Sequence, residues 1–125
     1  WDAQRALAAM RAHRKEEVSD VLLDQTIFAG VGNIIKNEVL SLAHVRPDAR
    51  VADLSIAKRK EIIAEARAYS FRFLQWRRAF VLRKHLLVHQ RSTCPHCGRK
   101  LVHEHTGTRK RMGHYCPRCQ HLHAR

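Results

Sequence analysis

The chain has 125 residues, enough to bury one hydrophobic core and to add at most a small second unit. Its 24 lysines and arginines outnumber its 11 aspartates and glutamates, and the formal net charge of +13 predicts a polyanionic partner rather than a merely solvated basic surface. No apolar run reaches the roughly 18–20 residues of a membrane span, and no secretory leader is recognisable, so we expect no membrane partner and a cytoplasmic location.

Four segments with apolar residues at helical spacing predict a mainly α body. The first two cover residues 2–13, where Asp2 is placed to cap the first turn, and residues 15–25. The third ends before Pro47, and the fourth is a long helix from about Ser55. The third helix presents Val31, Ile35, Val39 and Leu42, and the fourth presents Ile62, Ala66, Tyr69, Phe73, Trp76 and Phe80. We assign both stripes to the core.

After Phe80 the chain becomes a connector in which cations and histidines alternate with leucine and valine. A tail rich in cysteine and histidine follows and has no long apolar run. We therefore predict two units, a helical domain over residues 1–88 and a metal-binding finger over residues 89–125.

The tail holds two C-x2-C pairs, Cys94 with Cys97 and Cys116 with Cys119, separated by 18 residues. This spacing lets four thiolates close a tetrahedral site, so we predict one structural zinc ion without an open position for catalysis. Disulfides and a redox dithiol are the alternatives, and neither a secretion signal nor a βαβ pattern supports them. Histidines could replace cysteine ligands, namely His103, His105, His114, His121 and His123.

Between the two cysteine pairs we predict a β-hairpin, with strands at residues 101–104 and 110–115 and a turn at 105–108. Arg109, Lys110 and Arg111 then lie near its tip, where three consecutive cations can contact phosphates or remain solvated.

The stretch AGVGN precedes the third helix, and a helix N-terminus attracts anions because its first N–H groups are unpaired. Gly32 leaves room for a phosphate, Asn33 adds a side-chain donor, and Lys36, one turn further on, can add a phosphate contact or be part of the exposed surface. A tight loop after a helix C-cap would also use these glycines. Combined with the net charge, the pattern favours phosphate binding.

These residues carry a resemblance to a known family. LLDQ at 22–25, AGVGNI at 29–34, Glu38 and the terminal YCPRCQ at 115–120 resemble the C-terminal half of the formamidopyrimidine-DNA glycosylase and endonuclease VIII family. The resemblance implies a helix-two-turn-helix bundle followed by a zinc finger. It implies that Asn33 and Arg111 hold phosphates of kinked double-stranded DNA beside a flipped, damaged nucleotide, and it places Glu38 near the catalytic cleft without a firm role.

The resemblance also implies a glycosylase and abasic-site lyase that uses an N-terminal proline amine and an adjacent glutamate. This chain begins with Trp1 and Asp2, so we expect a catalytic domain upstream and a monomeric fragment that binds DNA without cutting it. Ile35 and Gly113 replace the tyrosine and threonine frequent in the family. The alternatives are a stand-alone DNA-binding module and a ribosome-associated RNA-binding protein. A metallohydrolase, or a second metal at His85 and His89, has less support.

Overall fold

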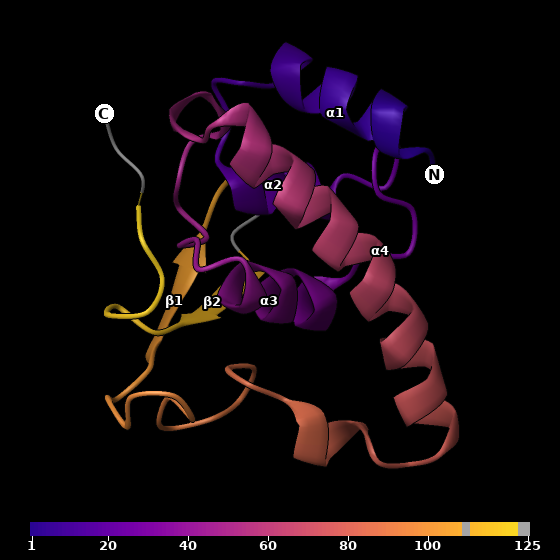
Figure 1. Cartoon of the computed structure of the whole chain (residues 1–125). Coiled ribbons are helices and arrows are strands. Elements are labelled where there is room, and N and C mark those ends of the chain that lie inside the picture. The colour runs from indigo at the N-terminus through magenta and orange to yellow at the C-terminus, as the bar shows by residue number, and fades with distance from the viewer. Residues whose placement is uncertain (109–110, 123–125) are drawn as a thin grey trace.

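The computed structural model of the chain describes residues 1–108 and 111–122. Figure 1 shows helices packed together, a hairpin at one side, and a long connector that returns beneath α3 to that hairpin. In chain order the elements are α1 (Ala3–Ala12), α2 (Val18–Leu23), α3 (Asn33–Leu42), the 3-10 turn η1 (Val51–Asp53), α4 (Ile56–Arg78), the 3-10 turn η2 (Leu82–His85), β1 (Val102–Thr106) and β2 (Arg111–Tyr115).

Helices α1 and α4 begin where a side chain accepts their first N–H groups. The Asp2 carboxylate accepts from the Gln4 N–H at 2.7 Å, and the Ser55 hydroxyl accepts from the Lys58 N–H at 3.0 Å, which confirms both predicted caps. Helix α2 is shorter than expected. It begins only at Val18, because Glu17 forms a bridge with Arg50 and holds the preceding backbone extended.

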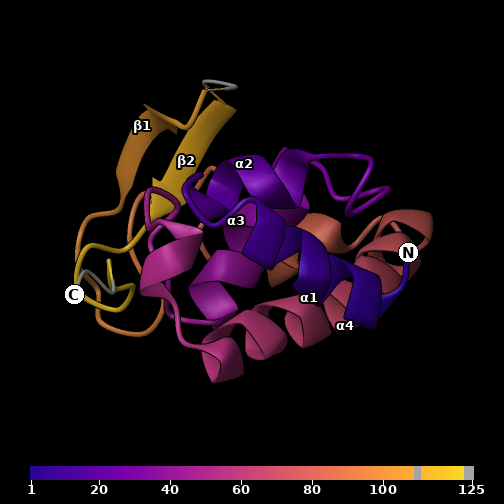
Figure 2. The same cartoon turned by 90° about the horizontal axis from the view of Figure 1, so that it is seen from above.

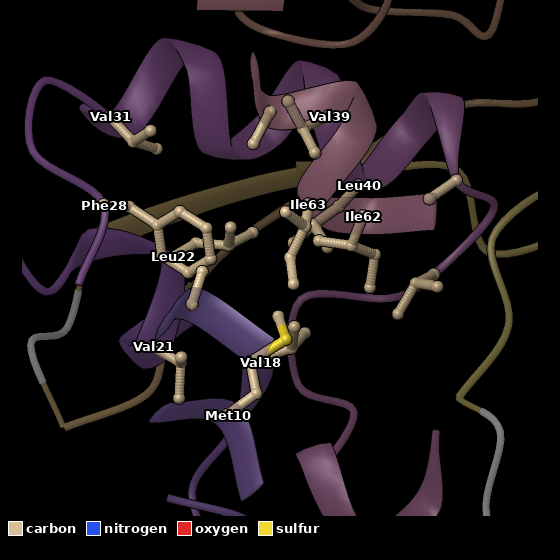
Figure 3. Close-up of a cluster of buried hydrophobic side chains, with 14 of the residues drawn as sticks. Met10, Val18, Val21, Leu22, Phe28, Val31, Val39, Leu40, Ile62 and Ile63 are labelled. Carbon is tan, nitrogen blue, oxygen red and sulfur yellow. The ribbon is translucent and has the colours of Figure 1, made fainter. Parts of the chain in front are cut away.

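The core lies between all four helices (Figure 3). Met10 from α1, Leu22 from α2 and Leu40 from α3 are fully buried, and Ile62 from α4 closes the layer against them. Burying a side chain of this size contributes about 1.5–3 kcal/mol, so this apolar cluster is the main stabilising feature of the helical body.

The end of α4 differs from the prediction. The helix stops at Arg78, and Phe80 adopts a left-handed backbone with φ +58° and is 95% exposed. Two hydrogen bonds close this turn, from the Phe80 N–H to the Arg77 carbonyl and from the Val81 N–H to the Trp76 carbonyl. This is a Schellman termination, which turns the chain away from the core, so the assignment of Phe80 to the core stripe was wrong.

The hairpin is antiparallel, with Val102 opposite Tyr115 and Thr106 opposite Arg111. Its first strand begins and ends later than expected because the ladder continues to Thr106, and the turn begins only at Gly107, which adopts φ +73°. Strand β2 packs on α3, and the view from above places the hairpin beside α2 and α3 (Figure 2). In the described ranges no helix is long and apolar enough to cross a membrane.

Candidate metal centre and nucleic-acid interface

The four predicted cysteines converge at the base of the hairpin. Their sulfur atoms all lie within 4.8 Å of one another; the Cys97 and Cys116 sulfurs are 3.5 Å apart, and those of Cys94 and Cys119 are 3.9 Å apart. A tetrahedral ion with metal–sulfur bonds of ~2.3 Å requires sulfur atoms roughly 3.8 Å apart. The cluster therefore fits a four-coordinate metal ion, and four thiolates would fill its coordination sphere.

Local backbone contacts shape each half of this cluster. Gly98 adopts φ +74° and donates its N–H to the Cys94 carbonyl at 2.9 Å, which turns the chain around the first pair of thiols. The backbone N–H of Arg99 lowers the pKa of the Cys97 thiol to about 7, whereas burial raises the pKa of the Cys116 and Cys119 thiols. Without a metal ion, Cys97 is therefore the thiol of this group that most readily becomes a thiolate.

Gln120 fastens the second pair of thiols to the helical body. Its side-chain carbonyl accepts from the Cys116 N–H at 2.8 Å, while its side-chain amide donates to the Val45 carbonyl at 2.9 Å. Gln120 is only 1% exposed, so this bridge is shielded from water. The cysteine cluster is thereby docked on the loop that follows α3.

The nearby histidines make other contacts. The rings of His89, His114 and His103 form a stack, with centroids 4.7 Å and 4.3 Å apart, and they are not members of the metal cluster among the residues described. Burial lowers the pKa of His114 to about 4, and its Nδ1 accepts the Gln90 N–H. His123 lies outside the described residues.

The glycine loop before α3 is held by one glutamine. Gln25 accepts from the Gly30 N–H at 2.9 Å and donates to the Val31 carbonyl at 2.9 Å. Gly30 adopts φ +90°, which favours glycine, and a side chain at Gly32 would meet no atom within 4 Å. Gly32 is also the N-cap of α3 and has no side chain with which to cap it. The start of α3 is therefore open to an approaching ligand.

A cavity of about 590 Å³ brings the predicted phosphate contacts together. Gly32 and Asn33 line it from the start of α3, and Arg111 lines it from the start of β2. The α4 residues Phe73 and Arg77 also line it. A second hollow of about 530 Å³ shares Gly32 and Arg111. Gly32 and Arg111, which are 79 positions apart in the sequence, thus line the same cavity. Arg77 and Arg111 are its charged lining residues.

The side chain of Asn33 connects the start of α3 to strand β2 by a hydrogen bond. Its side-chain amide donates to the Met112 carbonyl at 3.1 Å, whereas its side-chain oxygen is buried and has no hydrogen-bond partner in the described part of the chain. Because Arg111 precedes Met112 on β2, this contact holds the arginine beside the helix start.

Lys36 differs from its expected place. It is fully buried, its ammonium lies 3.4 Å from the Met112 carbonyl, and it does not line the cavity. Burial, with a contribution from Arg111, lowers its pKa to about 8. The side chain points beneath β2 because the hairpin covers this turn of α3, so a direct phosphate contact from Lys36 does not fit this structure. The predicted contacts Arg109 and Lys110 lie outside the described residues.

The comparisons with known proteins agree with this architecture. The family described as the formamidopyrimidine-DNA glycosylase H2TH domain matches residues 2–69. The chain belongs to this family. The likeness to solved structures covers nearly the whole chain. The structure of a viral DNA glycosylase matches 94% of this chain with a TM-score of 0.82 and 28% identity, and that of Lactococcus lactis formamidopyrimidine-DNA glycosylase matches 95% with a TM-score of 0.84 and 25% identity.

The amino-acid sequence of the chain is also similar to those of curated proteins. Endonuclease 8-like 3 of Xenopus laevis is 34% identical over 93% of this chain, and formamidopyrimidine-DNA glycosylase of Syntrophomonas wolfei is 32% identical over 93%. The chain spans 19% and 48% of the length of these two relatives, and 45% of each of the two solved structures.

Sequence reasoning missed the polar residues that join the helical body to the finger. Asp20 accepts the Thr108 N–H at 2.9 Å, and the side chain of Asn37 both donates to the Met112 carbonyl and accepts the His114 N–H. Glu38, which had no firm role, accepts backbone N–H groups of the connector. The available signal in the sequence was that Asn37 and Glu38 are consecutive polar residues between Ile35 and Val39, two apolar residues of the predicted core stripe of this helix.

Proposed function

We propose that this chain is the DNA-binding part of a base-excision-repair DNA glycosylase with abasic-site lyase activity, and that it holds backbone phosphates of kinked, damaged duplex DNA. The observation that carries the proposal is the shared cavity of Gly32, Asn33 and Arg111. A helix N-terminus without a side-chain cap and a guanidinium facing the same space together suit a phosphate group.

In this proposal α2, the glycine loop and α3 act as the helix-two-turn-helix element, and the hairpin acts as a zinc finger. Cys94, Cys97, Cys116 and Cys119 would hold one zinc ion, because a closed set of four thiolates is typical of structural zinc. The ion would stabilise the finger, and the finger would hold Arg111 at the cavity. Backbone phosphates carry no base sequence, so the grip would act on any duplex that bends into it.

The relatives support a DNA partner. One solved structure with which this chain shares its fold is described as formamidopyrimidine-DNA glycosylase non-covalently bound to DNA containing an AP site. Because the chain spans about half or less of these relatives, we assign the chemical steps to a catalytic domain upstream. Within this proposal the chain is monomeric and binds DNA without cutting it.

The test is an equilibrium titration of the zinc-loaded chain against a duplex with an abasic site and a matched undamaged duplex, with strand cleavage scored in the same samples. We expect binding without cleavage and tighter binding to the abasic duplex, which bends at lower cost. Tighter binding to structured RNA than to either duplex would instead support the RNA-binding alternative. Cleavage by nuclease-free protein would mean that an amine of this chain supplies the nucleophile.

A further inference from the structure

The exposed Phe80 at the end of α4 is the most unusual side chain on the surface. It is a large apolar residue at 95% exposure, and its backbone is left-handed. That conformation costs a non-glycine residue about 1–2 kcal/mol, and the corresponding position of a Schellman termination is usually glycine. Strain of this kind, combined with exposure of an aromatic ring, is typical of a functional position rather than a packing position.

The surroundings hold the backbone of Phe80 firmly. Trp76 accepts the Val81 N–H through its carbonyl, and its indole ring stacks on His85 at a centroid distance of 4.2 Å and an interplanar angle of 6°. The same indole ring also meets Tyr69 edge to face. Ring contacts with two residues thus anchor the last turn of α4, and the ring of Phe80 is presented to solvent from this base.

The positive charge around this turn favours a negatively charged partner. Residues 66–103 include nine lysines and arginines and no aspartate or glutamate. Arg77 and Arg78 lie just before Phe80 and are exposed, and Arg83 and Lys84 follow it and are exposed too. A protein partner would have to be strongly acidic to dock here, whereas a nucleic acid supplies both the negative charge and flat rings for an aromatic side chain.

The turn is also continuous with the proposed phosphate cavity. Arg77 lines that cavity, and its guanidinium lies 5.7 Å from the centroid of the Phe73 ring, another lining residue. Phe80 follows Arg77 by three residues and donates its N–H to the Arg77 carbonyl, so the turn that carries Phe80 is bonded to a residue of the cavity wall. DNA that leaves the cavity along α4 would meet the ring of Phe80.

We propose that Phe80 is a stacking platform for an unpaired base in a single-stranded stretch of DNA that continues from the phosphate cavity. This inference rests on the proposed function, because it takes DNA as the ligand of the cavity. Bases within a duplex are covered by their neighbours, so the ring can stack only where the strands separate. Stacking is tolerant of sequence, because every base has a π face.

The experiment compares two DNA ligands by fluorescence anisotropy with the zinc-loaded chain: a blunt duplex, and the same duplex with a short single-stranded extension. We expect wild type to prefer the extended DNA. Phe80→Ala and Phe80→Gly should each weaken binding to it about five-fold or more while leaving the blunt duplex unchanged, and Phe80→Trp should keep the preference. The control is Phe71→Ala, which removes another exposed ring of α4 and should change neither affinity.

Thermal melting of the same variants separates function from folding. Phe80→Gly should raise the melting temperature, because glycine adopts φ +58° without strain, even as it weakens binding. Equal losses on both DNA ligands, or no loss with Phe80→Ala, would overturn the stacking role but leave the phosphate cavity standing; the second result would point to a protein anchor. Failure of wild type to bind either DNA would overturn the proposed function as well.

Discussion

The Glu38 carboxylate accepts the backbone N–H of Val88 at 2.8 Å across 50 residues of sequence. The neighbouring N–H groups of Leu87 and His89 donate to the same carboxylate, and Glu38 is fully buried. Burial raises the pKa of Glu38, while these three hydrogen bonds oppose that rise. One side chain of α3 therefore fixes the connector that leads from α4 to the finger and places His89 at the cavity wall.

Glu38→Gln should lower the free energy of unfolding by about 2–3 kcal/mol, because an amide group would replace one acceptor with a donor in front of buried N–H groups. Urea denaturation followed by circular dichroism would measure this. The matched control is Glu61→Gln, which breaks an exposed ion pair with Lys58 and should change stability by less than about 1 kcal/mol. A loss no greater than that of the control would mean that Glu38 does not hold the connector.

Asn33→Ala and Arg111→Ala should each weaken binding to damaged and undamaged duplex alike, because both are proposed to act on phosphates. The affinity of wild type should fall with salt, with a slope of about −0.9 per phosphate neutralised in a log–log plot, and Arg111→Ala should reduce that slope by about one unit. Arg11→Ala changes a cation on α1, outside the lining of the cavity, and is the control. A strong loss confined to one base sequence would contradict phosphate binding.

Removal of the proposed zinc ion should unfold the finger before the helical body. The structural reason is that the four cysteines and Gln120 organise the base of the hairpin, whereas the main core is built from helical residues. We expect a strong zinc chelator to weaken DNA binding and to leave most of the helical circular dichroism signal at 222 nm, as judged against the same sample with zinc restored. Unchanged DNA affinity after verified zinc loss would exclude a role for the finger in holding Arg111.

Lys36 should make stability rise with pH in the alkaline range. Its pKa is about 8 in the folded chain and 10.5 in the reference state, so between these values the unfolded chain binds the extra proton and the free energy of unfolding increases. The full difference corresponds to roughly 3 kcal/mol. Lys36→Met should lack this rise when the two proteins are compared by urea denaturation from pH 7 to pH 11. Parallel curves would show that Lys36 is not buried as described.

Gly107→Ala should loosen the tip of the hairpin. A Cβ at this position would lie 2.3 Å from a carboxylate oxygen of Asp20, and φ +73° is strained for alanine. We expect a loss of about 1–3 kcal/mol in unfolding free energy. In a double-mutant cycle, Gly107→Ala should cost less stability in the Asp20→Ala background than in the wild-type background. Without the Asp20 carboxylate the clash disappears, and only the backbone strain remains. Strict additivity of the two changes would argue against contact between the tip and α2.

The amino-acid sequence alone determined the features that depend on neighbouring residues. Helical periodicity predicted four helices, Asp2 and Ser55 marked the starts of two of them, and the spacing of the cysteines predicted that four thiols converge. These predictions succeed because a helix repeats every 3.6 residues and a C-x2-C pair forms a knuckle by itself, so each signal lies within a few residues.

Only the tertiary structure decided which polar groups are buried and which apolar ones are not. Periodicity assigned Phe80 to the core, but the hydrogen bonds that end α4 turn it outward. Lys36 lies on the surface of an isolated helix and becomes buried because β2 covers it, and Glu38 finds its partners 50 residues away. Such outcomes depend on which segments meet in space, and the free energy of a buried charge or hydrogen bond is set by partners that no local pattern specifies.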